Sequence, residues 1–202
     1  MSNTVIVRVS VVLWCLGTLA CGTAPTPQYY LLGGAEPTTG ASAETPTAET
    51  LAVIGIGPLK FPDYLDRPQL VIRRGVEVDF LDGHRWAEPL ERSFSAALAE
   101  RVAERTGSDR VLVFPWSPGD GIERRVRGEV LRFDVDAMGR AELVVRWQVQ
   151  DGEGNVRVPA RRSRFSHGAA SQEPAGMVEA LAATVVAFGD QVVASMERQA
   201  GE

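Results

Sequence analysis

Few residues in this sequence could carry catalytic chemistry. There are only two histidines, His84 and His167, and neither lies in a motif that pairs a base with a nucleophile. Asp79 and Asp82 precede His84 closely enough to form part of a metal site, but one histidine and two carboxylates in a turn are more typical of a solvated loop. The glycine-rich segment 152–154 lacks the lysine and the strand–turn–helix setting of a phosphate-binding loop. The sequence therefore predicts a protein that is not an enzyme and has no metal or cofactor.

One cysteine has a clear chemical role. The apolar run from Val5 to Ala20, with Arg8 as its charge, is short for a membrane span and suits the core of a signal peptide. It ends in the segment TLACG at 18–22, which resembles a bacterial lipobox, where the cysteine is diacylated and becomes the mature N-terminus. Cys15 would be removed with the signal, so no thiol remains for a disulfide. We predict a lipoprotein signal peptide at 1–20 and lipidation at Cys21; the alternative is an ordinary secretory signal that happens to contain a cysteine.

The composition predicts one domain behind this anchor. A chain of 202 residues, 45% hydrophobic and 23% charged, is long enough for one well-buried core. The net charge of −5 argues against binding to nucleic acid. Residues 21–50 comprise the anchor, a short strand at 29–32 and a flexible loop rich in Pro, Thr and Ala; residues 51–199 form the globular domain.

Alternating apolar residues predict most of the sheet. Strands are expected at 51–57, 70–73, 76–81, 111–115, 123–135, 140–150 and 155–165. Turns are expected at 82–84 and 136–139, and the apolar parity of 123–135 switches near Val130, which indicates a β-bulge. Two amphipathic helices follow from apolar residues at spacings of three and four, one from Pro89 to Gly107 and one at 172–199. The fold class is thus α+β, with a largely antiparallel mixed sheet and both helices on one face.

The segment from Gly57 to Phe94 contains the candidate partner-binding residues. Prolines at 58, 62 and 68 favour extended backbone, so Leu59–Gln69 is expected to be an ordered loop and not a helix. Large amphipathic side chains of this segment suit an interface: Phe61, Tyr64, Leu65, Arg67, Arg85 and Trp86. The same side chains could instead close the core, and the sequence leaves both accounts open.

The same segment resembles a known family. The order FPDYLDRPQLVIR, a short strand, and then RWAEPLERSFSAALAERV is similar to the ABC-type transport auxiliary lipoprotein family, which includes paraquat-inducible protein C. The resemblance also covers YYLL at 29–32 and the stretch 111–151. It implies a non-catalytic auxiliary component of an MCE-type lipid transport system that docks the periplasmic MCE subunit of an inner-membrane complex.

Three functions follow as hypotheses. The first is this docking role, either by contact with the MCE subunit or with copies of this protein in a homo-oligomer. The second is a carrier that holds acyl chains itself, and the third is a tethered hydrolase. Gly22 after the cysteine resembles the sorting pattern for the outer membrane, so the expected location is the periplasmic face of that membrane. Only seven residues, 22–28, separate the anchor from the first strand and span at most about 25 Å, so the body must stay near its membrane.

The anchor gives a direct test. Replacing Cys21 with Ala is expected to leave an unprocessed or soluble form, because the thiol that receives the acyl chains is absent. Fractionation and intact-mass measurement of the membrane fraction check this. A mature wild-type N-terminus without acyl mass would show that the lipoprotein assignment is wrong.

Overall fold

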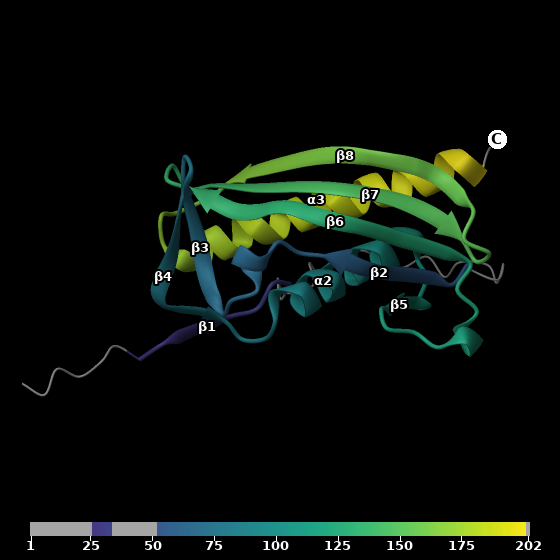
Figure 1. Cartoon of the computed structure of the whole chain (residues 1–202), viewed down its shortest axis with the longest axis horizontal. Helices are drawn as coiled ribbons and strands as arrows, with labels where there is room; N and C mark the ends of the chain where they lie inside the picture. The colour runs from purple at the N-terminus through teal and green to yellow at the C-terminus, as the bar shows by residue number, and fades with distance from the viewer. Residues whose placement is uncertain (1–25, 34–51, 201–202) are drawn as a thin grey trace, which may run out of the picture.

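A single long strand, β6 (Arg124–Asp136), pairs with three others and organises the sheet (Figure 1). The structure, a computed structural model, describes residues 26–33 and 52–200, so the predicted signal peptide, Cys21 and nearly all of the loop before residue 51 lie outside the described residues. Along one side of β6 runs antiparallel β7 (Arg140–Asp151), followed by antiparallel β8 (Val156–Gly168). These long ladders form the antiparallel body of the sheet.

The other side of β6 is shared by two parallel strands. β2 (Ile54–Lys60) pairs with the first half of β6, and β3 (Gln69–Arg74) pairs with its end at Val135 and Asp136. β4 (Glu77–Trp86) is antiparallel to β3, and β1 (Gln28–Tyr30) and β5 (Val111–Val113) add short parallel edges to β4 and β2. The result is a mixed sheet of eight described strands, as the predicted α+β class requires.

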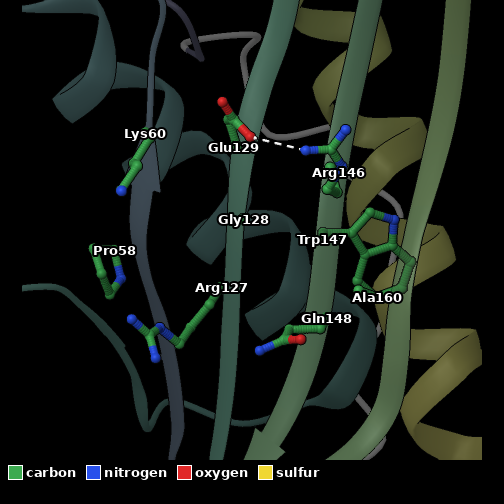
Figure 2. Close-up of a pocket in the computed structure, with 9 residues that line it drawn as sticks. All are labelled: Pro58, Lys60, Arg127, Gly128, Glu129, Arg146, Trp147, Gln148 and Ala160. Carbon is green, nitrogen blue, oxygen red and sulfur yellow. Dashed lines mark hydrogen bonds and ion pairs between the residues drawn. The ribbon is translucent and has the colours of Figure 1, made fainter.

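Both helices lie against one face of the sheet. α2 (Leu90–Thr106) follows Pro89 and ends at Gly107, whose φ of 66° is the left-handed conformation that glycine adopts readily. α3 (Pro174–Ala200) packs on β6, β7 and β8 and also contacts α2. Figure 2 shows both helices behind the strands, so that neither of the described α-helices covers the opposite face of the sheet. The predicted helices and their common face are confirmed.

Aromatic side chains fill the space between sheet and helices. Phe94 of α2 is fully buried and makes edge contacts with Phe61 and Phe133, each with ring centroids 5.3 Å apart. Phe188 of α3 makes a similar edge contact with Trp147, with ring centroids 5.6 Å apart. Such pairs add about 0.5–1.5 kcal/mol each to the burial of their surface. The core therefore joins both helices to β6 and β7 through rings.

Helix α3 is long enough and apolar enough to span a membrane. Its most apolar window, within Pro174–Gln199, has a mean hydropathy of 1.5, and 56% of that window is buried inside the fold. Phe188 and Val192 belong to the hydrophobic core. These contacts make α3 the principal core helix of the domain.

Two local predictions are wrong. The turn expected at 82–84 is part of β4, where Gly83 has a φ of 78° and the register with β3 shifts between Gln69 and Val71. These turn-forming residues make a bulge because β1 pairs with His84–Trp86 and keeps the strand extended. The irregular segment before β3 is also shorter than expected: β2 continues to Lys60, and Asp63–Leu65 form one turn of 3-10 helix, η1.

β2 and β6 also contain a bulge, of which the sequence predicted the one in β6. The register of β6 and β7 shifts between Val130 and Arg132, which confirms the predicted bulge. Pro58 lies within β2, where the register with β6 shifts between Ile56 and Leu59. Proline has no N–H for a ladder, and a bulge is one of the few places where a strand accepts it.

The turn between β7 and β8 depends on Asp151. Its carboxylate accepts hydrogen bonds from the backbone N–H of Glu153 and of Asn155, from the Asn155 amide at 3.0 Å and from Arg157 Nε at 2.9 Å. These bonds, that of the Asn155 side chain first, lower the pKa of Asp151 from 3.8 to about 2. The ionised carboxylate contributes its full free energy of stabilisation above the pKa that it has in the unfolded chain. This contribution is lost as pH falls through the lower pKa of the folded protein.

We therefore expect the stability difference between wild type and Asp151→Asn to be largest near neutral pH. The difference should narrow as pH falls from 3.8 to about 2, because the wild-type carboxylate then becomes protonated. Urea unfolding at several pH values measures it. A difference that stays constant over this range would contradict the role given to the ionised carboxylate.

Candidate functional site

The predicted partner-binding residues divide into buried and exposed groups. Leu65 and Trp86 are only 4% and 5% exposed and belong to the core. Phe61 is partly buried against Phe94. Arg67 and Arg85 are exposed. Leu65 and Trp86 therefore close the core, while partner binding by the exposed residues of the segment stays a prediction.

Tyr64 takes part in a buried charge network. Its hydroxyl donates to Asp134 Oδ2 at 3.2 Å, and the guanidinium of Arg73 lies 5.3 Å from its ring centroid. Asp134 has no exposed surface and is also paired with Arg73 Nε at 2.8 Å and Arg132 Nε at 2.7 Å. Burial, and next the charge of Asp134, raise the pKa of Tyr64. These contacts hold η1 against β3 and β6.

Beside Arg67 lies a hollow of about 320 Å³, which we call the proline-loop hollow. It is lined by Asp66, Arg67, Pro68, Trp86, Ala87, Glu88, Pro89 and Leu90. Arg67 also covers the ring of Phe80, with its guanidinium carbon 4.8 Å from the centroid. The segment around the three prolines therefore presents a polar rim over a buried indole, a composition typical of contact surfaces.

A second surface lies on the face of the sheet opposite α2 and α3. This hollow of about 280 Å³, here called the sheet trough, crosses β2, β6, β7 and β8 (Figure 2). Its lining comprises Pro58, Lys60, Arg127, Gly128, Glu129, Arg146, Trp147, Gln148 and Ala160. Gly128 is one of the lining residues. A Cβ there would come within 2.6 Å of the Arg146 carbonyl oxygen. Any larger residue would force β6 and β7 apart.

The sheet trough carries positive charge that the described residues do not neutralise. In the described part of the chain, the side chain of Lys60 makes no ion pair or hydrogen bond. Arg127 has only a long contact, 3.4 Å, to the Gln150 amide oxygen. Arg146 pairs with Glu129 at 3.3 Å across exposed side chains, a pair of little energetic value, and Arg162 lies opposite Arg146 in the ladder.

Sequence reasoning missed this surface. The alternation of Arg125, Arg127 and Glu129 indicates a wet face, but Lys60 joins it through the parallel pairing Lys60↔Glu129 and Arg162 through Arg146↔Arg162. Neither pairing is local in sequence. The signal that could have found it is the excess of arginine over acid at alternate positions of the two strands 123–135 and 155–165.

The residues first considered for catalysis have separate partners. His84 Nδ1 shares a hydrogen bond of 2.9 Å with the Tyr30 hydroxyl, and Asp79 pairs with Arg74 at 3.1 Å. Among the described residues, no three His, Cys, Asp or Glu side chains are grouped to hold a metal ion. What the two surfaces offer is recognition: guanidinium and ammonium groups that attract anions and donate hydrogen bonds to them.

The different burial of Tyr64 and Arg67 predicts different effects of truncation. Tyr64→Ala should lower the free energy of unfolding by about 2 kcal/mol or more, because it removes a partly buried ring and a hydrogen bond to Asp134. Arg67→Ala should cost less than about 1 kcal/mol, the range of an exposed cation–π contact. Urea unfolding of both variants, with Tyr64→Phe as a control that retains the ring, measures this. Equal and small losses would show that Tyr64 does not support the fold.

Comparison with known proteins places this architecture in a family. The family described as the ABC-type transport auxiliary lipoprotein component matches residues 30–193. No curated protein sequence matches the chain. The fold is similar to a crystal structure of an uncharacterized protein, with TM-score 0.68, 16% identity and coverage of 85% of this chain and 99% of that one. It is also similar to a Xanthomonas campestris protein of the family DUF330, with TM-score 0.61, 12% identity and coverage of 74% and 88%. With its match over most of its length, this chain belongs to the ABC-type transport auxiliary lipoprotein family.

Proposed function

We propose that this protein is the outer-membrane-anchored, non-catalytic docking component of an MCE-type lipid transport system. In this proposal Cys21 carries the acyl chains, and the domain lies on the periplasmic face of the membrane. The domain receives the periplasmic MCE subunit, which is connected to the permease and ATPase of the inner membrane. Membership of a transport auxiliary family supports the general role.

The observation that carries the proposal is the sheet trough. Lys60 and Arg127 line it, and Arg162 lies opposite Arg146 in the ladder; all three are exposed and have no carboxylate partner among the described residues, in a protein whose net charge is −5. A local field of opposite sign to the whole molecule orients an approaching partner, so that an acidic surface meets this face first. The trough is open to solvent, which suits a protein surface better than a small substrate enclosed for reaction.

The core supports docking more than carriage of lipid. A domain that holds acyl chains needs an apolar cavity between its layers. Here that space is occupied by Phe94, Phe133, Trp147 and Phe188, each at most 1% exposed and in ring contact with others of the set. The apolar face of the sheet and the apolar faces of the two helices are thus buried against each other.

The short tether adds a geometric requirement. With about 25 Å between Cys21 and β1 at full extension, the domain cannot cross the periplasm alone. An inter-membrane role therefore needs a bridging partner, and the MCE subunit would be that partner. Neighbouring genes for a permease, an ATPase and an MCE protein would strengthen this assignment.

Reversing charge in the trough is expected to weaken docking. The double variant Lys60→Glu and Arg127→Glu should lower the affinity for the MCE subunit of the same system by about tenfold or more, or ~1.4 kcal/mol, because it repels an acidic partner. Affinity is measured on purified lipoprotein in detergent, at low and at high salt. The difference should shrink at high salt, since exposed charges are screened.

Two controls make this measurement specific. Arg110→Glu changes an exposed arginine before β5 and should leave affinity unchanged, while Arg67→Ala together with Arg85→Ala tests the proline-loop surface separately. Binding that is unaffected by all these variants would refute docking through either surface. Release of bound lipid from the pure protein would instead favour the carrier function.

A further inference from the structure

We infer that two adjacent hairpin tips, at Val76 and Met138, contact the membrane that holds the lipid anchor. The inference rests on the proposed anchoring at Cys21 and adds the orientation of the domain on its bilayer. Val76 is 96% exposed and Met138 is 82% exposed, the two highest values among the exposed large hydrophobic side chains of the described chain. Water at both positions solvates apolar surface that a membrane would bury.

The topology places the two tips side by side. Val76 lies in the turn between β3 and β4, and Met138 lies in the turn between β6 and β7. β3 and β6 run parallel, and their last paired residues are Arg73 and Asp136. Both strands end in a turn just beyond this pair, so the two hairpin tips lie at the same end of the sheet (Figure 1).

β1, the first described strand after the tether, begins at this same end of the molecule (Figure 1). It is parallel to the last residues of β4, with Gln28 opposite His84. From His84 to Glu77 the strand covers at most about 23 Å, because β4 bends at Gly83, and the seven residues from Gly22 to Gln28 span at most about 25 Å. An acylated Cys21 can therefore reach the level of the tips.

The tips are also built to present their side chains. Asp136 Oδ1 accepts hydrogen bonds from the backbone N–H groups of Met138 and Arg140, both at 2.9 Å, and its carbonyl accepts one from Gly139. These bonds satisfy the backbone N–H groups of Met138, Gly139 and Arg140, while the Met138 side chain stays exposed. Such satisfaction matters at a membrane, where an unpaired N–H is costly.

Charges around the tips fit a lipid surface. Arg140, next to the β6–β7 turn, is exposed and has no ion pair within the described residues, so it is available to a lipid phosphate. Arg74 is exposed and paired with Asp79 at 3.1 Å, and Glu77 is the acidic neighbour of Val76. An apolar tip with arginines at its base is the arrangement that enters the interface between headgroups and acyl chains.

Single cysteines test this contact in the intact lipoprotein. Cys15 is expected to leave with the signal and Cys21 to be acylated, so Val76→Cys, Met138→Cys or Val156→Cys introduces one reactive thiol for an environment-sensitive fluorophore. Val156 is the matched control, because it is a large exposed apolar residue, 52% exposed, at the start of β8 and the opposite end of the long ladders. Unchanged melting temperatures would show that all three variants keep the fold.

The labelled proteins are reconstituted into vesicles of phosphatidylethanolamine and phosphatidylglycerol, with and without a lipid-borne quencher. We expect blue-shifted emission and lipid quenching for labels at 76 and 138, and neither for the label at 156. Protein that stays on the vesicles with all three labels equally exposed overturns this inference and leaves the anchor intact. Protein that separates from the vesicles overturns the anchor itself. A blue shift without lipid quenching shows that the tips contact a second copy or another protein, and this result also overturns the inference.

Discussion

The carboxylate of Asp134 joins more elements of this fold than any other polar group considered above. It is fully buried and is paired with Arg73 of β3 and Arg132 of β6, while Tyr64 of η1 donates to it. Arg132 also pairs with Glu142 of β7, and Glu142 pairs with Arg164 of β8 at 2.9 Å. A buried carboxylate is tolerated only when its charge is compensated, and removing one partner of such a pair typically costs about 3–5 kcal/mol. The sheet, from β3 to β8, and the segment of the three prolines are thus tied to one charge.

The parts of the fold that could be predicted from the sequence are those that depend on residues close together in the chain. The β6–β7 hairpin and its bulge depend on local turn residues and on parity within one strand, so the sequence was sufficient for both. Helix α2 was equally clear from Pro89 and Gly107. The turn at 82–84 was predicted wrongly because pairing with the distant β1 overrides a local turn preference. Residue type alone could not separate Tyr64 from Arg67, since their roles depend on Asp134, which lies far along the chain.

The candidate functional surfaces show the same division between local and distant information. The segment around Arg67 was found from its prolines and amphipathic side chains, which lie close together in sequence. The sheet trough needed the pairing of four strands, because Lys60, Arg127 and Ala160 belong to different elements. Charge composition also hid it, since the whole chain is acidic. Family membership came from a continuous motif, whereas the charged face depends on tertiary structure.

The last strand of the sheet has a consequence for how copies of the protein crowd together. β8 is 13 residues long and, among the described strands, pairs only with β7, so its outer edge presents backbone groups that could accept another strand. Arginines at 157, 161, 162 and 164 lie along it. Two such edges brought together would place like charges in register, which opposes the merging of neighbouring sheets into a continuous one. A protein confined to two dimensions by a lipid would meet its copies often, and this edge would keep those encounters reversible.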